Sequence, residues 1–104
     1  MAKISSSVED SVRKFLNVVS RHYHIQEAYV YGSQAKGSAT SWSDIDVALV
    51  SSDFSDDLFE ERLALMHTAA SIDDRIEPYP FTLETFNEND PLASEIQQHG
   101  LRIT

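Results

Sequence analysis

The 104-residue sequence predicts one small α/β domain of the mixed, α+β kind. Its length matches the commonest size of a single domain, and 41% apolar residues suffice for a modest core. Segments with helical and with strand spacing of apolar residues follow one another in the order α-β-β-α-β-α. This order predicts a small mixed sheet with helices packed mainly on one face, formed by residues 1–104 as a single domain.

The first helix is expected from Ser6 to about Tyr23, because Ser6 and Glu9 form a capping-box pattern. Its apolar residues recur at helical spacing: Val8, Val12, Phe15, Leu16 and Val19. A short strand, EAYVY at 27–31, then runs into a Gly-Ser turn.

The second strand is expected in DIDVALVSS, residues 44–52. Side chains alternate between the two faces of a strand, so Ile45, Val47 and Leu49 share one face. The other face carries Asp44, Asp46, Ala48 and Val50. The two aspartates therefore point the same way.

The second half of the chain predicts a helix, a strand and a helix. Ser55, Asp56 and Asp57 precede a helical pattern from Leu58 to Ala69. A third strand at 75–82 contains Pro78 and Pro80, which confine it to the edge of the sheet because proline donates no ladder bond. Asp90-Pro91 caps a last helix through Gln98, and Gly100 is expected as its left-handed C-cap.

The net charge is −9, and residues 53–104, with twelve acidic and three basic residues, carry all of the imbalance. Such a chain cannot assemble the basic face that binding to duplex nucleic acid requires, so we expect no such binding. The acidic half is either a solvated surface or a face for a basic protein partner.

No apolar run approaches the roughly 18 residues that span a bilayer, and the N-terminus lacks the apolar stretch of a signal peptide. We therefore expect a cytoplasmic protein without membrane contact. The absence of cysteine excludes disulfides and thiolate metal sites.

The stretch YGSQAKGSATSWSDIDVALV, residues 31–50, holds the candidate site. Gly32 can adopt backbone angles that other residues avoid, and Ser33 can cap a helical turn over 34–36. Backbone N–H groups in such a turn can bind the outer phosphates of a nucleotide. Tyr31 and Trp42 border this turn, where they either stack on a nucleobase or pack against the protein.

Asp44 and Asp46 lie two residues apart on the second strand, so their backbones are roughly 6 to 7 Å apart on one face. Their oxygens can converge on one hard cation. They are either exposed polar positions or, on a partly covered strand, ligands of a magnesium ion that also binds the phosphates.

Gly32-Ser33, ten intervening residues and Asp44-x-Asp46 resemble the signature of the minimal nucleotidyltransferases of the DNA polymerase β superfamily. The resemblance implies a polymerase β-like fold and a magnesium-dependent nucleotidyltransferase that uses ATP. It implies that Asp44, Asp46 and a third acid bind two Mg²⁺ ions. Glu77 matches the third position best, with Asp73 or Asp74 as alternatives.

The same resemblance implies that Gly32, Ser33, Lys36 and Ser43 contact the nucleotide, although Gln34 stands where family members often carry arginine. Minimal nucleotidyltransferases are commonly encoded beside a HEPN-type ribonuclease toxin, which implies AMP transfer to a hydroxyl of that toxin, a tyrosine, and an antitoxin role. Two alternatives remain open. One is a non-catalytic antitoxin that neutralises by binding, and the other is nucleotidyl transfer to a small molecule.

Overall fold

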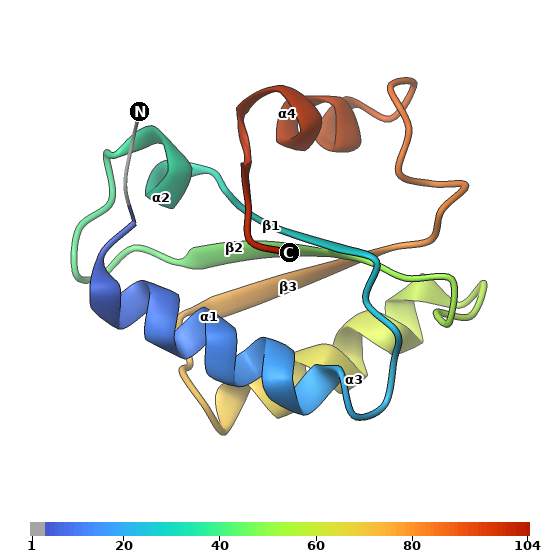
Figure 1. Ribbon diagram of the computed structural model, residues 1–104, viewed down its shortest axis with the longest axis horizontal. Helices are drawn as coiled ribbons and strands as arrows, with labels where there is room; N and C mark the ends of the chain where they lie inside the picture. Colours follow the sequence, from blue (N-terminus) through green and yellow to red (C-terminus); the bar gives the residue numbers. More distant parts are fainter. Residues whose placement is uncertain (1–3) are drawn as a thin grey trace.

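The computed structural model describes residues 4–104, and it contains every helix and strand expected above together with one further short strand (Figure 1). The elements are α1 (Ser6–Val19), β1 (Glu27–Tyr31), α2 (Ser33–Lys36), β2 (Ile45–Val50), α3 (Leu58–Ala70), β3 (Ile76–Phe81), α4 (Pro91–His99) and β4 (Leu101–Arg102). The single turn α2 was expected from the sequence, whereas β4 was not. No helix within residues 4–104 is both long enough and apolar enough to cross a membrane.

The strands form one mixed sheet in the order β3-β2-β1-β4. β1 pairs antiparallel with β2 and β4, and β2 pairs parallel with β3 through the crossover helix α3. β3 is an edge strand, as its prolines predict. The Pro78 carbonyl accepts a hydrogen bond of 3.2 Å from Arg62 Nε, so its backbone polar group points away from β2. Pro80, two residues further, faces the same side, and neither proline removes a bond from the ladder.

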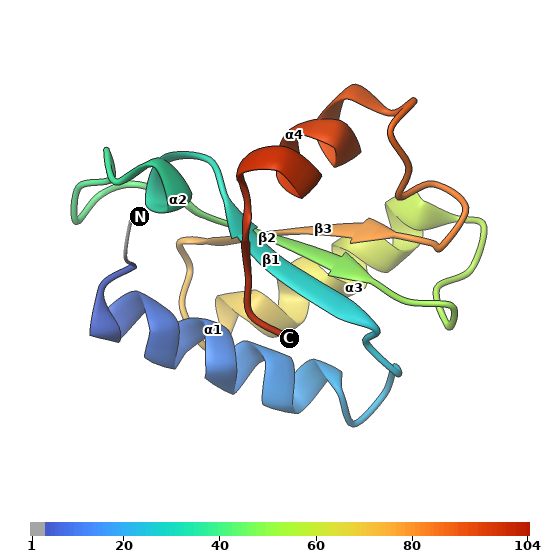
Figure 2. The ribbon, with the colours of Figure 1, turned by 45° about the horizontal axis from the view of Figure 1, so that its top comes forward.

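Helices cover the two faces of the sheet unequally, with the long α1 and α3 on one side and the shorter α4 on the other (Figures 1 and 2). The larger core lies under α1 and α3 and includes Ile45, Val47 and Leu49, which are fully buried. The smaller core lies under α4 and includes Ala48 and Val50. This division confirms the predicted alternation of β2 and the arrangement of helices mainly on one face.

Both ends of the helical pattern in α1 differ from the sequence expectation. The N-cap is Ser5, whose hydroxyl accepts a hydrogen bond of 3.3 Å from the Val8 amide, so the cap lies one residue earlier than predicted. The helix ends at Val19, because the following residues form turns whose amides bond back to the Val19 carbonyl, Tyr23 N at 3.0 Å among them.

The prediction of a left-handed C-cap at Gly100 is wrong. Gly100 has φ −72° and ψ 156°, an extended conformation. The physical reason is β4, which starts at the next residue and pairs Leu101 with Val30 of β1. A chain that leaves a helix directly into a strand must extend at this point, whereas a left-handed residue would turn it back.

Asp73 fixes the turn between α3 and β3. Its carboxylate accepts hydrogen bonds of 2.8 Å from Arg75 Nη2 and from the Ser11 hydroxyl of α1. The bonds from Arg75 are the main reason why the pKa of Asp73 lies well below its usual value. The ionised carboxylate is therefore part of the folded structure and links the turn to α1.

We predict that Asp73→Asn lowers the free energy of unfolding by about 1–2 kcal/mol at pH 7, the size of a lost hydrogen bond to a charged group. The folded-state pKa is depressed, so this stabilisation is present above the unfolded pKa of about 4 and is lost as the pH falls below it. Urea unfolding at pH 7 and at successively lower pH measures both effects. An unchanged difference between wild type and variant across this range would contradict the assignment.

Candidate functional site

Three polar side chains form a row across the sheet, one from each of three neighbouring strands. Asp46 of β2 is the partner of Tyr31 in the antiparallel register with β1 and of Glu77 in the parallel register with β3. Residues paired in this way lie about 5 Å apart at the backbone and point to the same face. The row lies on the α4 side of the sheet, since Asp46 shares its face with the core residues Ala48 and Val50. The predicted acids Asp46 and Glu77 are thus neighbours.

Gly32 brings the backbone of the turn against the carboxylate of Asp46. Its φ of 71° lies in the region that favours glycine, and a Cβ at this position would lie only 2.5 Å from Asp46 Oδ2. Any other residue here would therefore have a strained backbone and would require the Asp46 carboxylate to move. Gly32 is the N-cap of α2, which begins at Ser33, so the predicted phosphate-binding turn directly adjoins the row.

Asp44 lies just before β2 on an exposed loop that a buried amide supports. Gln34 is 5% exposed, and its Nε2 donates a hydrogen bond of 3.2 Å to the Asp44 carbonyl. The residue that stands where the family often has arginine is therefore a structural support. Within the same loop the Ser43 hydroxyl accepts a hydrogen bond of 2.9 Å from the Thr40 amide, so Ser43 also shapes the approach to Asp44.

The two aromatic residues beside the turn behave differently. Trp42 is 91% exposed, so it does not pack against residues 4–104 in the way that aromatic residues beside a turn usually do. Tyr31 packs against the smaller core under α4. Burial, followed by the charge of Asp46, raises the pKa of Tyr31 to about 12. The Tyr31 side chain is therefore uncharged at physiological pH and borders the site.

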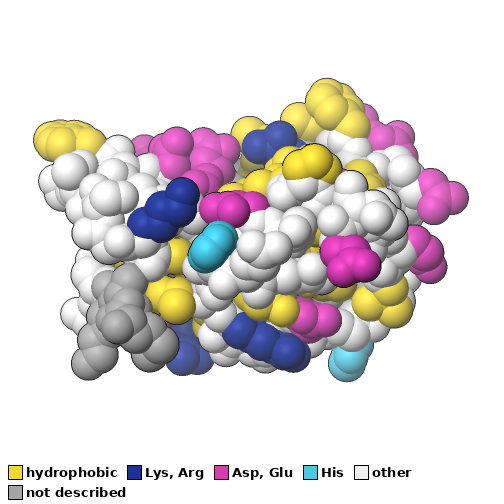
Figure 3. All heavy atoms as spheres, turned by 90° about the horizontal axis from the view of Figure 1, so that it is seen from above, with side chains coloured by type: hydrophobic (Ala, Val, Ile, Leu, Met, Phe, Trp, Pro, Cys, Tyr) yellow, Lys and Arg dark blue, Asp and Glu magenta, His cyan; other side chains and the backbone are white. Residues whose placement is uncertain are grey.

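Like charges crowd the row. The pKa of Asp46 is raised, first by its burial and then by the charges of Asp44 and Glu77. The ionised form of Asp46 is thus disfavoured until a cation compensates it. The α4 side of the molecule shows more acidic than basic side chains (Figure 3).

Arg62 brings a positive charge to the row from the other side of the sheet. It belongs to α3, yet its guanidinium carbon lies 5.2 Å from the centre of the Tyr79 ring on β3. Its charge acts to lower the pKa of Tyr31, against burial and the acids. From the sequence Arg62 is only one residue of the helical pattern from Leu58 to Ala69, because a side chain that reaches around an edge strand leaves no local signal.

Lys36, the basic residue expected to face phosphates, lies at the end of α2 and contacts α4. Its Nζ is 3.7 Å from Glu95 Oε1, and Glu95 Oε2 is 4.0 Å from His99 Nε2. All three side chains are about half exposed. Such a surface pair contributes little to stability, so a more highly charged anion can compete for Lys36.

The donor set of the row suits a hard cation, since Asp44, Asp46 and Glu77 offer only carboxylate oxygens. As the side chains lie, however, no three Asp, Glu or His residues among 4–104 converge closely enough to hold a metal ion. A shared cation therefore requires at least one carboxylate to turn. Asp73 is already bonded to Arg75 and Ser11, whereas Glu77 is in register with Asp46.

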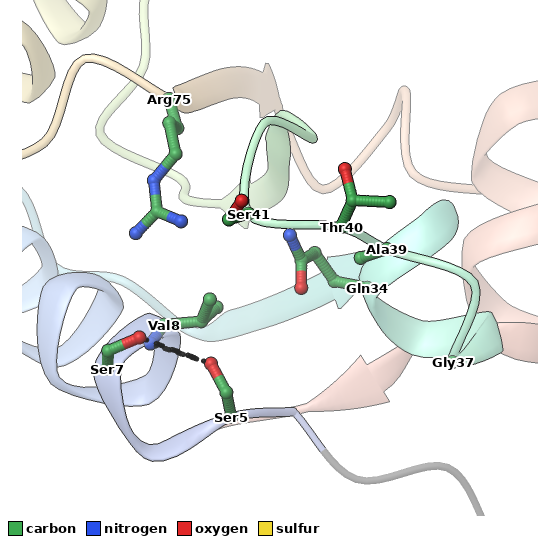
Figure 4. Close-up of a pocket in the computed structure, with 9 residues that line it drawn as sticks. All are labelled: Ser5, Ser7, Val8, Gln34, Gly37, Ala39, Thr40, Ser41 and Arg75. Carbon is green, nitrogen blue, oxygen red and sulfur yellow. Dashed lines mark hydrogen bonds between the residues drawn. The ribbon is translucent and has the colours of Figure 1, made fainter.

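A cavity of about 370 Å³ lies beside the candidate site and does not contain it. It opens between the start of α1, the loop after α2 and Arg75, and Gln34 lines it (Figure 4). None of the three acids borders this cavity. The acids instead lie on the open α4 side of the sheet, where a large partner can reach them.

The family model described as "Polymerase beta, Nucleotidyltransferase" matches residues 13–104 of this chain. A comparison with curated proteins finds no match.

Three solved structures are similar. A toxin–antitoxin crystal structure with AMP-PNP is 24% identical, with TM-score 0.67 over 92% of this chain and 72% of that one. A crystal structure of a mutant of the toxin–antitoxin MntA-HpeT is 25% identical, with TM-score 0.63 over 92% and 71%. A putative nucleotidyltransferase from Sulfolobus solfataricus is 22% identical, with TM-score 0.57 over 86% and 83%.

We predict that Asp46→Asn stabilises the protein at neutral pH by roughly 1 kcal/mol, as removal of strain at a functional residue often does. The folded-state pKa of Asp46 is raised, so its ionisation costs stability once the pH exceeds the unfolded value near 4. The gain should therefore vanish at lower pH, where the carboxyl is protonated. Thermal unfolding of wild type and variant at pH 7 and pH 3 without metal measures this gain. A variant less stable than wild type at pH 7 would contradict the repulsion between Asp46 and its acidic neighbours.

We predict that Gly32→Ala destabilises the fold more than Gly37→Ala. Both glycines have positive φ, 71° and 77°, so alanine is strained at either position. Gly37 lies in the left-handed region, whereas Gly32, with ψ −143°, lies in a region that is open almost only to glycine and costs alanine more. Only Gly32→Ala also places a Cβ against Asp46 Oδ2. Urea unfolding of the two variants measures the difference, and a loss for Gly32→Ala no larger than that for Gly37→Ala would contradict the prediction.

Proposed function

Because the chain belongs to the polymerase beta nucleotidyltransferase family, we propose that it transfers AMP from ATP to a tyrosine hydroxyl of a HEPN-type ribonuclease toxin and thereby acts as its antitoxin. The observation that carries the proposal is the row of Asp46 and Glu77 directly against the Gly32 turn. Phosphate-binding and metal-binding groups meet there, as nucleotidyl transfer requires.

Two of the similar structures support the nucleotide and the partner. Both are toxin–antitoxin structures, and one of them contains AMP-PNP, an ATP analogue. The structure with AMP-PNP is 24% identical to this chain and supports the fold. The MntA-HpeT structure is 25% identical and supports a toxin as the partner. A protein partner also agrees with a site on an open face.

In this proposal Asp44, Asp46 and Glu77 would hold two Mg²⁺ ions, which would supply charge stabilisation for the transferred phosphoryl group. The Gly32 and Ser33 backbone binds the β- and γ-phosphates, and Lys36 and Ser43 assist. Lys36 must leave Glu95 to do so. Trp42, which is exposed beside Asp44, is available to stack on the nucleobase.

The chemical step needs a base for the acceptor hydroxyl. The hydroxyl oxygen bonds to the α-phosphorus, the bond from that phosphorus to the bridging oxygen of the β-phosphate breaks, and pyrophosphate leaves. The acceptor proton passes to Asp46 or Glu77, the carboxylates of the row that serve as the nearest general base. A tyrosine suits this site because a phenol loses its proton more readily than serine.

Two observations favour a second function, a non-catalytic antitoxin that neutralises the toxin by contact. Lys36 is paired with Glu95, and the three acids do not converge as the side chains lie. A protein that only binds its toxin needs neither group free.

The test is intact-mass spectrometry of the proposed HEPN-type toxin, after incubation with the chain, ATP and Mg²⁺. We expect added AMP units, which disappear with Asp44→Asn and with Glu77→Gln. Asp74→Asn is the matched control and should retain transfer, because Asp74 lies outside the row. No mass shift, together with full neutralisation of the toxin by Asp44→Asn, would overturn transfer and establish the binding antitoxin.

A further inference from the structure

Helix α3 carries large apolar side chains on its exposed side as well as on its buried side. Phe59, Leu63 and Met66 are 70%, 45% and 39% exposed. Their spacing of four and three residues places them in one line along the helix. Leu65 and Ala69 are buried against the larger core on the other side. Single exposed apolar residues are common on protein surfaces, but an aligned set indicates a surface that a partner covers.

The neighbouring edge of the sheet limits how a partner can bind here. The free side of β3 offers no amide at Pro78 or Pro80, and Arg62 already occupies the Pro78 carbonyl. An added strand would therefore find few hydrogen bonds along this edge. A partner must dock through side chains instead.

Charge indicates what kind of partner fits. The exposed acids Asp56 and Glu60 lie at the start of α3, within an acidic half of twelve acidic and three basic residues. A second copy of this chain would oppose a net charge of −9 with the same charge. A basic protein with exposed apolar side chains is complementary in both respects.

The line of apolar residues is connected to the candidate site through Arg62. Arg62 precedes Leu63 on α3, and its side chain reaches past the β3 edge to Tyr79, where its charge acts on Tyr31. From Phe59 to Met66 the helix rises by roughly 10 Å, along the same edge strand that carries Glu77. A partner seated on α3 therefore lies on the other face of the sheet from the row of acids, but next to the β3 edge around which Arg62 reaches that row.

We propose that Phe59, Leu63 and Met66 form the surface on which the basic toxin partner docks, so that its acceptor hydroxyl reaches Asp46 and Glu77 past the β3 edge. This inference rests on the proposed function for the identity of the partner. It does not depend on whether the chain modifies that partner or only binds it.

The test measures association of the purified chain with the proposed HEPN-type toxin by calorimetry, together with AMP transfer. We expect Leu63→Glu/Met66→Glu to raise the dissociation constant at least about tenfold, as loss of a buried apolar contact does. The KM for the toxin should rise in parallel, while kcat and the affinity for Mg-ATP stay unchanged. Leu83→Glu, at another exposed leucine on the segment that leads to α4, is the matched control and should bind like wild type.

Two further variants keep the test sharp. Phe59→Ser changes one exposed residue and should weaken binding without loss of helix in circular dichroism. Asp56→Lys/Glu60→Lys should slow association at low salt more than at high salt.

The outcomes separate the two proposals. Unchanged binding by both apolar variants would overturn the docking surface and leave the proposed function intact. Binding that depends on α3 without any AMP transfer would support the surface and overturn the enzyme. A wild-type chain that neither binds nor modifies the toxin would overturn the proposed function, and the docking surface with it.

Discussion

The register of β2 is the constraint on which both the core and the candidate site depend. Side chains alternate along a strand, so a slip of one residue would exchange the two faces completely. Asp46 would then enter the larger core, and Val47 would take its place in the row. Because Ile45, Val47 and Leu49 are fully buried under α1 and α3, the hydrophobic effect holds the acids on the opposite face. The same burial that stabilises the fold therefore positions Asp46 beside Glu77.

Asp73 and Asp46 lie near the same end of the sheet, but their surroundings shift their pKa values in opposite directions. Asp73 is bonded to Arg75 and Ser11, and its ionised form stabilises the fold. Asp46 lies among other acids, and its ionised form is disfavoured. A group that serves only the structure is normally compensated by its neighbours, whereas a site that must bind a cation leaves charge uncompensated. This contrast supports the proposed role of Asp46 as a ligand of a cation.

The parts of the structure that short-range patterns encode could be predicted from the sequence. The alternation of β2, the edge position of β3 and the turn at Gly32 each follow from a few adjacent residues. β4 could not be predicted, because a strand of two residues is too short to show an alternating pattern. The wrong prediction of a left-handed C-cap at Gly100 followed, since Gly100 extends directly into β4. The contacts of Arg62 with Tyr79 and of Lys36 with Glu95 join distant segments, so no local pattern reports them. For the third acid the sequence left three alternatives, and the parallel register of β2 with β3 now favours Glu77.

The side chains of Lys36 and Arg62 are held by different kinds of contact, which suit different tasks. Lys36 is paired with an exposed carboxylate, and such a pair contributes about 0–1 kcal/mol and weakens with salt. A triphosphate carries more charge than one carboxylate, so it can displace Glu95 at small cost. Arg62 is held by the Pro78 carbonyl and the Tyr79 ring, and no carboxylate within residues 4–104 forms an ion pair with it. Its charge therefore stays uncompensated and fixed in place, which suits a residue that orients what approaches the acids from the β3 edge.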